Sequence, residues 1–85
     1  MLHYDNVSIE IPPWSGVPRY VAELWRMHKG DDVAVCAVLT HPDGAQLRLT
    51  VNGEIKQTDA THHVFALSTV ALAWEERWHW MKGWR

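Results

Sequence analysis

Two turn signals divide the middle of this chain, and they limit its fold more than any other feature. His41-Pro42-Asp43-Gly44 has what a tight turn needs: proline presets φ, aspartate bonds to nearby backbone and glycine accepts a positive φ. Asn52-Gly53 is the strongest short signal for a two-residue hairpin loop. Between them, residues 45–51 alternate apolar and polar side chains, as a half-buried strand does. This segment is therefore predicted to be the middle strand of an antiparallel meander.

The segments on either side of it are predicted to be its partners. Residues 33–39 are apolar at every position, which indicates a strand covered on both faces. Residues 54–61 are polar and indicate an edge strand, blunted by Lys56 and Asp59. A two-residue loop would turn Ile55 outward, whereas a three-residue loop with a bulge would turn it inward. We favour the bulge, with Ile55 inward.

A helix is predicted on each side of the meander. The first begins with Ser15 as its N-cap, holds Pro18 in its first turn and stops at Gly30. On a helical period its apolar face consists of Val17, Tyr20, Val21, Leu24, Met27 and His28. The second spans about 64–82, with Thr61 as its candidate cap and Gly83 as its end. Its main apolar stripe consists of Val64, Leu67, Val70, Ala71, Trp74, Trp78 and Met81.

The predicted fold is a two-layer α+β domain in the order α-β-β-β-α, with both helices on one face of the three-stranded meander. We expect a single domain, 1–85, with residues 15–85 as the core and 1–14 as an extended N-terminal arm. Within the arm, the alternation of residues 7–11 predicts an additional strand that Pro12-Pro13 ends. The core candidates are Tyr20, Leu24, Leu47, Leu49, Leu67, Trp74 and Trp78.

Composition excludes several classes of protein. Eight Lys and Arg against ten Asp and Glu give a net charge of −2, which argues against nucleic acid or an anionic membrane as the main partner. The single cysteine, Cys36, excludes an internal disulfide, and its apolar neighbours predict a buried, unreactive thiol. The first residues lack the pattern of a secretory signal, and no apolar stretch is long enough to span a bilayer. We therefore expect a cytoplasmic protein.

No residue pattern in the sequence predicts catalysis. There is no nucleophile motif, no glycosidase-like carboxylate pair and no phosphate-binding glycine loop. The six histidines lack metal-site spacing. Glu75 and His79 lie one helical turn apart and would supply two ligands, whereas a site needs three or four. We expect no enzyme activity, no cofactor and no metal.

The second helix has more apolar residues than one buried face can use. Trp80 and Trp84 lie at least about 80° from the stripe formed by Leu67, Trp74 and Trp78, at the rotation of about 100° per helical residue. Three explanations stay open: the N-terminal arm with Trp14 covers this side, another subunit or partner covers it, or it lines an aromatic pocket for a small apolar or sugar-like ligand. We favour an interface, most simply that of a twofold homodimer, with Trp80 and Trp84 as anchors and Arg77 at the rim.

The predicted function is therefore protein interaction, as a small regulatory or scaffolding module that self-associates. On this hypothesis, Trp78→Ala destabilises the fold, whereas Trp84→Ala weakens association and leaves the fold intact. Nucleic-acid binding is an alternative, because α-β-β-β-α resembles the order of double-stranded RNA-binding domains. Those domains place lysines at the start of the last helix, on the phosphates. Residues 61–66 contain no lysine.

Part of the chain also resembles a group of small uncharacterised bacterial proteins. The likeness rests on His41-Pro42-Asp43-Gly44 with the following residues to Glu54, and on Trp78-x-x-Met81-Lys82-Gly83-Trp84. It covers roughly residues 33–85, and it departs at Ala45, where that group often has a larger aromatic residue. The resemblance implies a bacterial, cytoplasmic, single-domain protein, and it carries over no catalytic residue.

Overall fold

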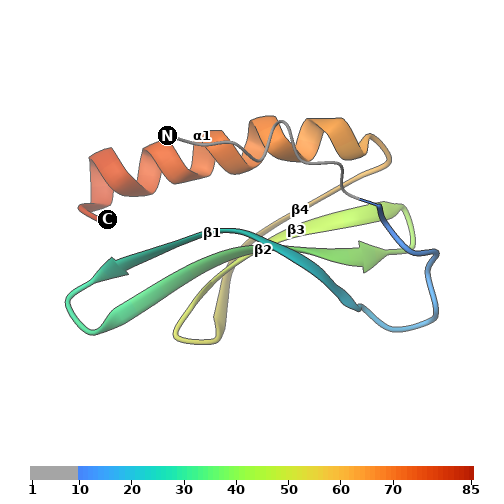
Figure 1. Ribbon diagram of the computed structural model, residues 1–85, viewed down its shortest axis with the longest axis horizontal. Helices are drawn as coiled ribbons and strands as arrows, with labels where there is room; N and C mark the ends of the chain where they lie inside the picture. Colours follow the sequence, from blue (N-terminus) through green and yellow to red (C-terminus); the bar gives the residue numbers. More distant parts are fainter. Residues whose placement is uncertain (1–9) are drawn as a thin grey trace.

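The part of the protein that the structure describes is a two-layer α+β fold with one sheet and one C-terminal helix. The computed structural model describes residues 10–85. Its elements are β1 (Tyr20–Lys29), β2 (Asp32–His41), β3 (Gly44–Val51), β4 (Glu54–Thr61) and α1 (Val64–Lys82). The strands form one antiparallel sheet in the order β1-β2-β3-β4, and α1 lies across one face of it (Figure 1). The predicted meander and last helix are present, and Gly83 ends the helix with a φ of 75°.

The predicted first helix is wrong, because the segment that follows Pro18 forms β1. Its pairing with β2 shifts between Tyr20 and Ala22 and again between Glu23 and Trp25. Each shift inserts one extra residue into β1, as in a β-bulge, so that residues on one side of the strand lie three positions apart. Ala22 and Trp25 both face α1 in this way. An apolar spacing of three imitates the period of a helix, which explains the error.

The turns at Pro42 and Asn52 lie where the sequence predicts them. Asn52 and Gly53 both have positive φ, 52° and 85°, as the two-residue loop requires. Gly30 does not end a helix. It has a φ of 61° and joins β1 to β2 in a two-residue turn, with glycine first as in a type II′ hairpin. All three connections between strands are therefore tight hairpins.

The loop before β4 combines both alternatives considered for Ile55. The loop has two residues, and Thr50 pairs with Ile55. The register then shifts, so that Leu49 pairs with Gln57 and Lys56 is the extra residue. Ile55 consequently points away from the helix and is exposed, so the prediction that it faces inward is wrong. The bulge places Gln57 on the face that α1 covers.

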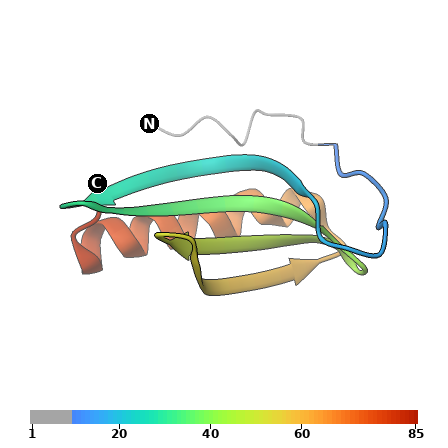
Figure 2. The same ribbon diagram turned by 90° about the horizontal axis from the view of Figure 1, so that it is seen from below.

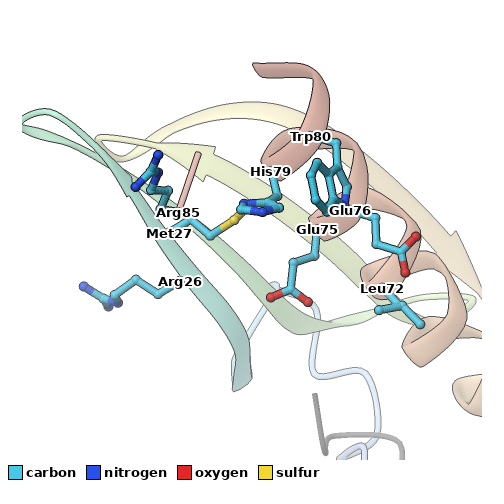
Figure 3. Close-up of a pocket in the computed structure, with 8 residues that line it drawn as sticks. All are labelled: Arg26, Met27, Leu72, Glu75, Glu76, His79, Trp80 and Arg85. Atoms are coloured by element: carbon cyan, nitrogen blue, oxygen red, sulfur yellow. The ribbon is translucent and has the colours of Figure 1, made fainter. Parts of the chain in front are cut away.

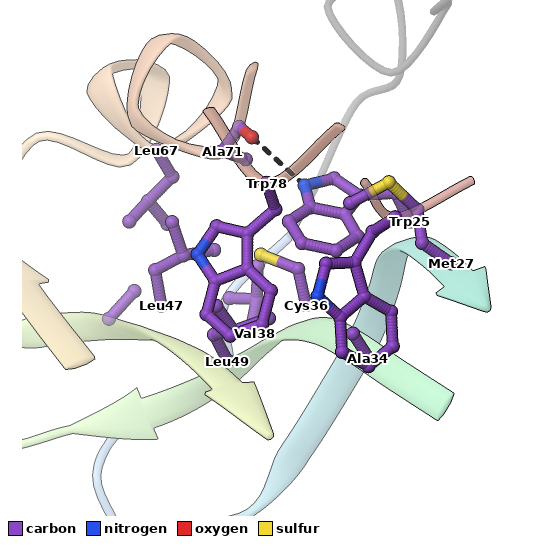
Figure 4. Packing of buried hydrophobic residues seen from close by; sticks show 12 residues of the cluster. Trp25, Met27, Ala34, Cys36, Val38, Leu47, Leu49, Leu67, Ala71 and Trp78 are labelled. Atoms are coloured by element: carbon purple, nitrogen blue, oxygen red, sulfur yellow. Dashed lines mark hydrogen bonds between the residues drawn. The ribbon is translucent and has the colours of Figure 1, made fainter. Parts of the chain in front are cut away.

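The core fills the space between α1 and the sheet (Figure 4). Four of the predicted core residues are buried: Leu47, Leu49, Leu67 and Trp78. Leu24 and Trp74 are partly buried against the same cluster. Tyr20 is exposed, so its assignment to the core is wrong, because its partner Leu39 belongs to the outward face of β2. Three large members of the core are not among the predicted core residues: Trp25, Met27 and Trp84.

Two tryptophan N–H groups attach the helix to opposite edges of the sheet. From β1, the Trp25 Nε1–H donates to the Ala71 carbonyl oxygen at 2.9 Å (Figure 4). From α1, the Trp78 Nε1–H donates to Gln57 Oε1 on β4 at 2.7 Å. Since β1 and β4 are the two edge strands, these bonds fix the helix across the full width of the sheet.

The last residues fold back onto the molecule. The N–H groups of Gly83 and Trp84 both donate to the Trp78 carbonyl oxygen, and the Trp84 ring lies 5.5 Å from the Trp78 ring. Trp84 is only 6% exposed, so it belongs to the core of this chain. Its expected place outside the core is wrong, because the helix ends before it and the helical period no longer applies. Arg85 then exchanges two backbone hydrogen bonds with His28 at the free edge of β1.

The N-terminal arm is described only in part. The predicted strand over residues 7–11 and the arm over 1–14 fall mostly on residues 1–9, outside the described residues. Glu10 and Ile11 are not in a strand. Ile11 packs against the core cluster, whereas Trp14 is exposed. Thr61 is not the N-cap of α1, which is His63, but its hydroxyl oxygen accepts a hydrogen bond from the His63 N–H at 3.0 Å.

Gly44→Ala is predicted to destabilise the fold more than Gly53→Ala. Both glycines have positive φ, where a residue with a side chain is strained by about 1–3 kcal/mol. Only at Gly44 does a Cβ also come within 2.7 Å of a backbone oxygen, that of Thr61. At Gly53 it meets nothing within 4 Å. Urea unfolding measures the difference, and equal losses for the two variants would contradict it.

Trp84→Ala is now expected to destabilise the fold by about 3–5 kcal/mol, as Trp78→Ala is, because both indoles are buried against each other. The measurement is the free energy of unfolding in urea, at a concentration where the chain is monomeric. Trp80→Ala is the matched control, and it should stay within about 0.5 kcal/mol of the wild type because its ring lies outside the core. A Trp84→Ala variant as stable as that control would show that the tail does not dock.

Candidate functional site

The side of α1 that points away from the sheet is apolar although it faces solvent. Phe65 and Trp80 are 80% and 79% exposed, one near each end of the helix. Six exposed positions make up this side, and we call them the outer stripe: Phe65, Thr69, Leu72, Ala73, Glu76 and Trp80. Glu76 is its one charged member. The stripe arises because the sequence places apolar residues on the helix beyond those that the core uses.

The predicted interface residues have separate positions in the structure. Trp80 is exposed on the outer stripe, and Arg77, three residues before it, is exposed on the flank of α1 that faces β4. Trp84 is not with them, because it is buried under the end of the helix. Met81, predicted to lie in the buried stripe, is as exposed as Phe65. Trp84 folds back against Trp78 and occupies the core position that Met81 was expected to fill.

A groove of about 600 Å³ runs between α1 and the β1 edge of the sheet (Figure 3). Its apolar lining comes from both elements and consists of Met27, Leu72 and Trp80. Arg26 and Arg85 line the strand side, and three titratable residues line the helix side: Glu75, Glu76 and His79. Three residues of the outer stripe thus also line the groove, so the two features form one continuous surface.

Glu75 is the most unusual titratable residue in the groove. Its Oε1 is buried and has no hydrogen-bond partner among residues 10–85. Burial raises the pKa of this carboxyl group above its usual value, and the neighbouring Glu76 carboxylate acts in the same direction. His79 is held in place beside it, with Nδ1 2.7 Å from the Trp84 carbonyl oxygen and its ring edge-on to Trp80. Arg26 is already paired with Glu23 at 2.7 Å.

The described residues bring together no group of side chains that could hold a metal ion. Across residues 10–85, no three His, Cys, Asp or Glu side chains converge, and Glu75 with His79 stays a pair. Cys36 lies inside the core, where burial raises the pKa of its thiol to about 12. The thiol is therefore protonated and inaccessible at neutral pH. In the same part of the chain, no helix combines the length and the apolar character needed to cross a bilayer.

The sheet face opposite α1 is a second, weaker candidate surface (Figure 2). No described element covers it, although the apolar run of β2 was predicted to be covered on both sides. Ala37 and Leu39 point to this face and are nevertheless only 7% and 8% exposed. Their partners across the strands are long side chains: Glu23 and Arg48 beside Ala37, and Tyr20 and Gln46 beside Leu39. The neighbouring strands thus shield the apolar centre of this face, whereas nothing described shields the outer stripe.

The chain matches no protein-family model, no curated protein and no solved structure. The resemblance to small bacterial proteins therefore stays a prediction.

Glu75→Gln is predicted to stabilise the fold near neutral pH. The pKa of Glu75 is raised in the folded state, so the contribution of its protonated form is fully present below the unfolded-state value and is lost as pH rises through the folded-state value. The neutral amide avoids that loss. Thermal melts between about pH 3.5 and 7.5 measure it.

The stability advantage of Glu75→Gln over the wild type should therefore grow with pH and vanish in acid. Asp59→Asn removes a carboxylate from an exposed position of β4 and serves as the control. A difference from the wild type that does not change with pH, or that is largest in acid, would contradict the argument.

Proposed function

We propose that this protein is an interaction module that self-associates through the outer stripe of α1. The observation that carries the proposal is the exposure of two large aromatic side chains, Phe65 and Trp80, on the same helix whose other side forms the core. Tryptophan and other aromatic residues are the side chains that most often anchor protein interfaces. An exposed stripe of this kind on a small monomer indicates an interaction surface.

The site contains little that supports another kind of function. Nucleic-acid binding rested on the element order α-β-β-β-α, and the chain begins its described structure with a strand instead of a helix. The net charge of −2 also offers phosphates no general attraction. The proposal therefore includes no catalytic activity, no cofactor and no metal, and it places the protein in the cytoplasm, as the sequence predicts.

Binding of a small ligand in the groove is a second candidate. It is supported by the apolar lining of Met27, Leu72 and Trp80 and by the unpartnered oxygen of Glu75. The groove adjoins the outer stripe, so a bound partner that covers Trp80 would also close it. The two candidates are distinguished by the oligomeric state, since a ligand site needs no second copy of the chain.

Light scattering across a concentration series tests the proposal. We expect the wild-type mass to rise from 9.8 kDa toward twice that value, because association removes the outer stripe from water. Trp80→Ser should shift the midpoint of this rise at least tenfold upward in concentration, since anchor truncations of this kind cost more than about 1.4 kcal/mol.

Ile55→Ser is the matched control, because it replaces an exposed apolar residue on the opposite sheet face. It should leave the midpoint unchanged. A monomer at all concentrations would overturn the proposal and favour the groove as a ligand site. Loss of association in Ile55→Ser alone would assign the interface to the sheet.

A further inference from the structure

We propose that the second copy packs against α1 antiparallel, about a twofold axis that passes between Leu72 and Ala73. This inference rests on the proposed self-association and specifies its partner, orientation and register. It is drawn from the positions of the outer stripe along the helix. An antiparallel twofold pair brings residue n of one copy to the level of residue 145 − n of the other when the axis lies at this point.

The outer stripe is symmetric about this point. Phe65 of one copy comes level with Trp80 of the other, and Thr69 comes level with Glu76. Leu72 comes level with Ala73. Every exposed position of the stripe thus meets another position of the same stripe, and none is left facing a position outside it. A surface that complements itself in this way is what an isologous dimer interface requires.

The side chains in each pair also fit by size and chemistry. On a helical wheel Phe65 and Trp80 lie on opposite sides of the middle of the stripe, at about 100° per residue. At one level of the dimer the two rings therefore lie side by side instead of colliding. Leu72 meets the small Ala73 in the same manner. At the middle of the stripe the Thr69 hydroxyl faces the Glu76 carboxylate, to which it is able to donate a hydrogen bond.

Charge favours this orientation over a parallel one. Residues 64–74 of α1 contain no charged side chain, whereas Glu75, Glu76, Arg77 and Lys82 all lie in the second half of the helix. A parallel pair in register would place Glu76 directly against Glu76 of the second copy, within an apolar interface. The antiparallel pair separates these carboxylates and sets the charged half of each helix against the uncharged half of the other. It also opposes the two helix dipoles.

Single cysteines at Thr69 and Glu76 test the register. Both positions are exposed, so neither substitution removes a core side chain. The native Cys36 is fully buried and does not form disulfides with the introduced thiols while the chain is folded. The Thr69→Cys and Glu76→Cys chains are purified separately and oxidised under mild conditions, alone and as an equal mixture, at a concentration where light scattering shows the dimer. Covalent products are identified on a non-reducing gel and by mass.

The mixture should give a disulfide between the two different chains, at least tenfold more abundant than the product of either chain alone. In the proposed dimer, position 69 of one copy lies level with position 76 of the other. Two copies of position 69 are offset along the axis by seven residues, or about 10 Å, which exceeds the Cα separation of about 7 Å that a disulfide spans.

Three results would overturn the inference, and they separate it from the proposed self-association. Efficient linkage of Thr69→Cys to itself shows a parallel pair. A dimer by light scattering with no covalent product in the mixture shows that another register or another face is used, and self-association then stands while the inference fails. A chain that is monomeric at every concentration removes both. As a positive control for oxidation, the Ala73→Cys chain should link to itself, because it lies next to the axis.

Discussion

The structure depends on the attachment of a single helix across the whole width of a four-stranded sheet. Two indole N–H groups provide it, one from Trp25 on β1 and one from Trp78 on α1. Between these bonds the contact surface is made of small and medium side chains, with Ala34, Ala45 and Ala71 fully buried. Among the described residues, α1 is the one helix or strand that covers this face. The outer stripe lies on the opposite side of the same helix, away from the sheet.

The end of α1 shows how the side of the helix that forms the core is kept separate from the outer stripe. The helical period would bury Met81 and leave Trp84 outside the core. The chain instead exposes Met81 and buries Trp84 after the helix has ended. Gly83 turns the backbone, and Trp84 packs under Trp78 while Arg85 bonds to the edge of β1. This arrangement completes the core with a residue from outside the helix. Trp80 is left outside the core.

The two faces of the molecule differ in how apolar residues are shielded. On the sheet face, cross-strand neighbours with long polar side chains, such as Arg48 beside Ala37, leave little apolar surface in contact with water. On the helix, Ser68 and Thr69 lie three and four positions after Phe65, and these short side chains leave its ring 80% exposed. Apolar residues are therefore shielded on the sheet face and exposed on the outer stripe. This is the physical reason for assigning the interaction to α1.

Local pattern alone determined the hairpins at Pro42 and Asn52, the strands that they join, the last helix and its end at Gly83. These features depend on the residues preferred in turns and on the spacing of apolar residues along the chain, both of which are visible in a short stretch of sequence. The exposure of Trp80 also followed from the period. Tertiary structure decided the rest. Two bulges give β1 an apolar spacing of three, which resembles the period of a helix. Only the pairing with β2 shows that this segment is a strand. The bulge at Lys56 set the direction of Ile55 and of Gln57 for the same reason. The burial of Trp84 required a docking surface built from distant residues, which no local pattern contains.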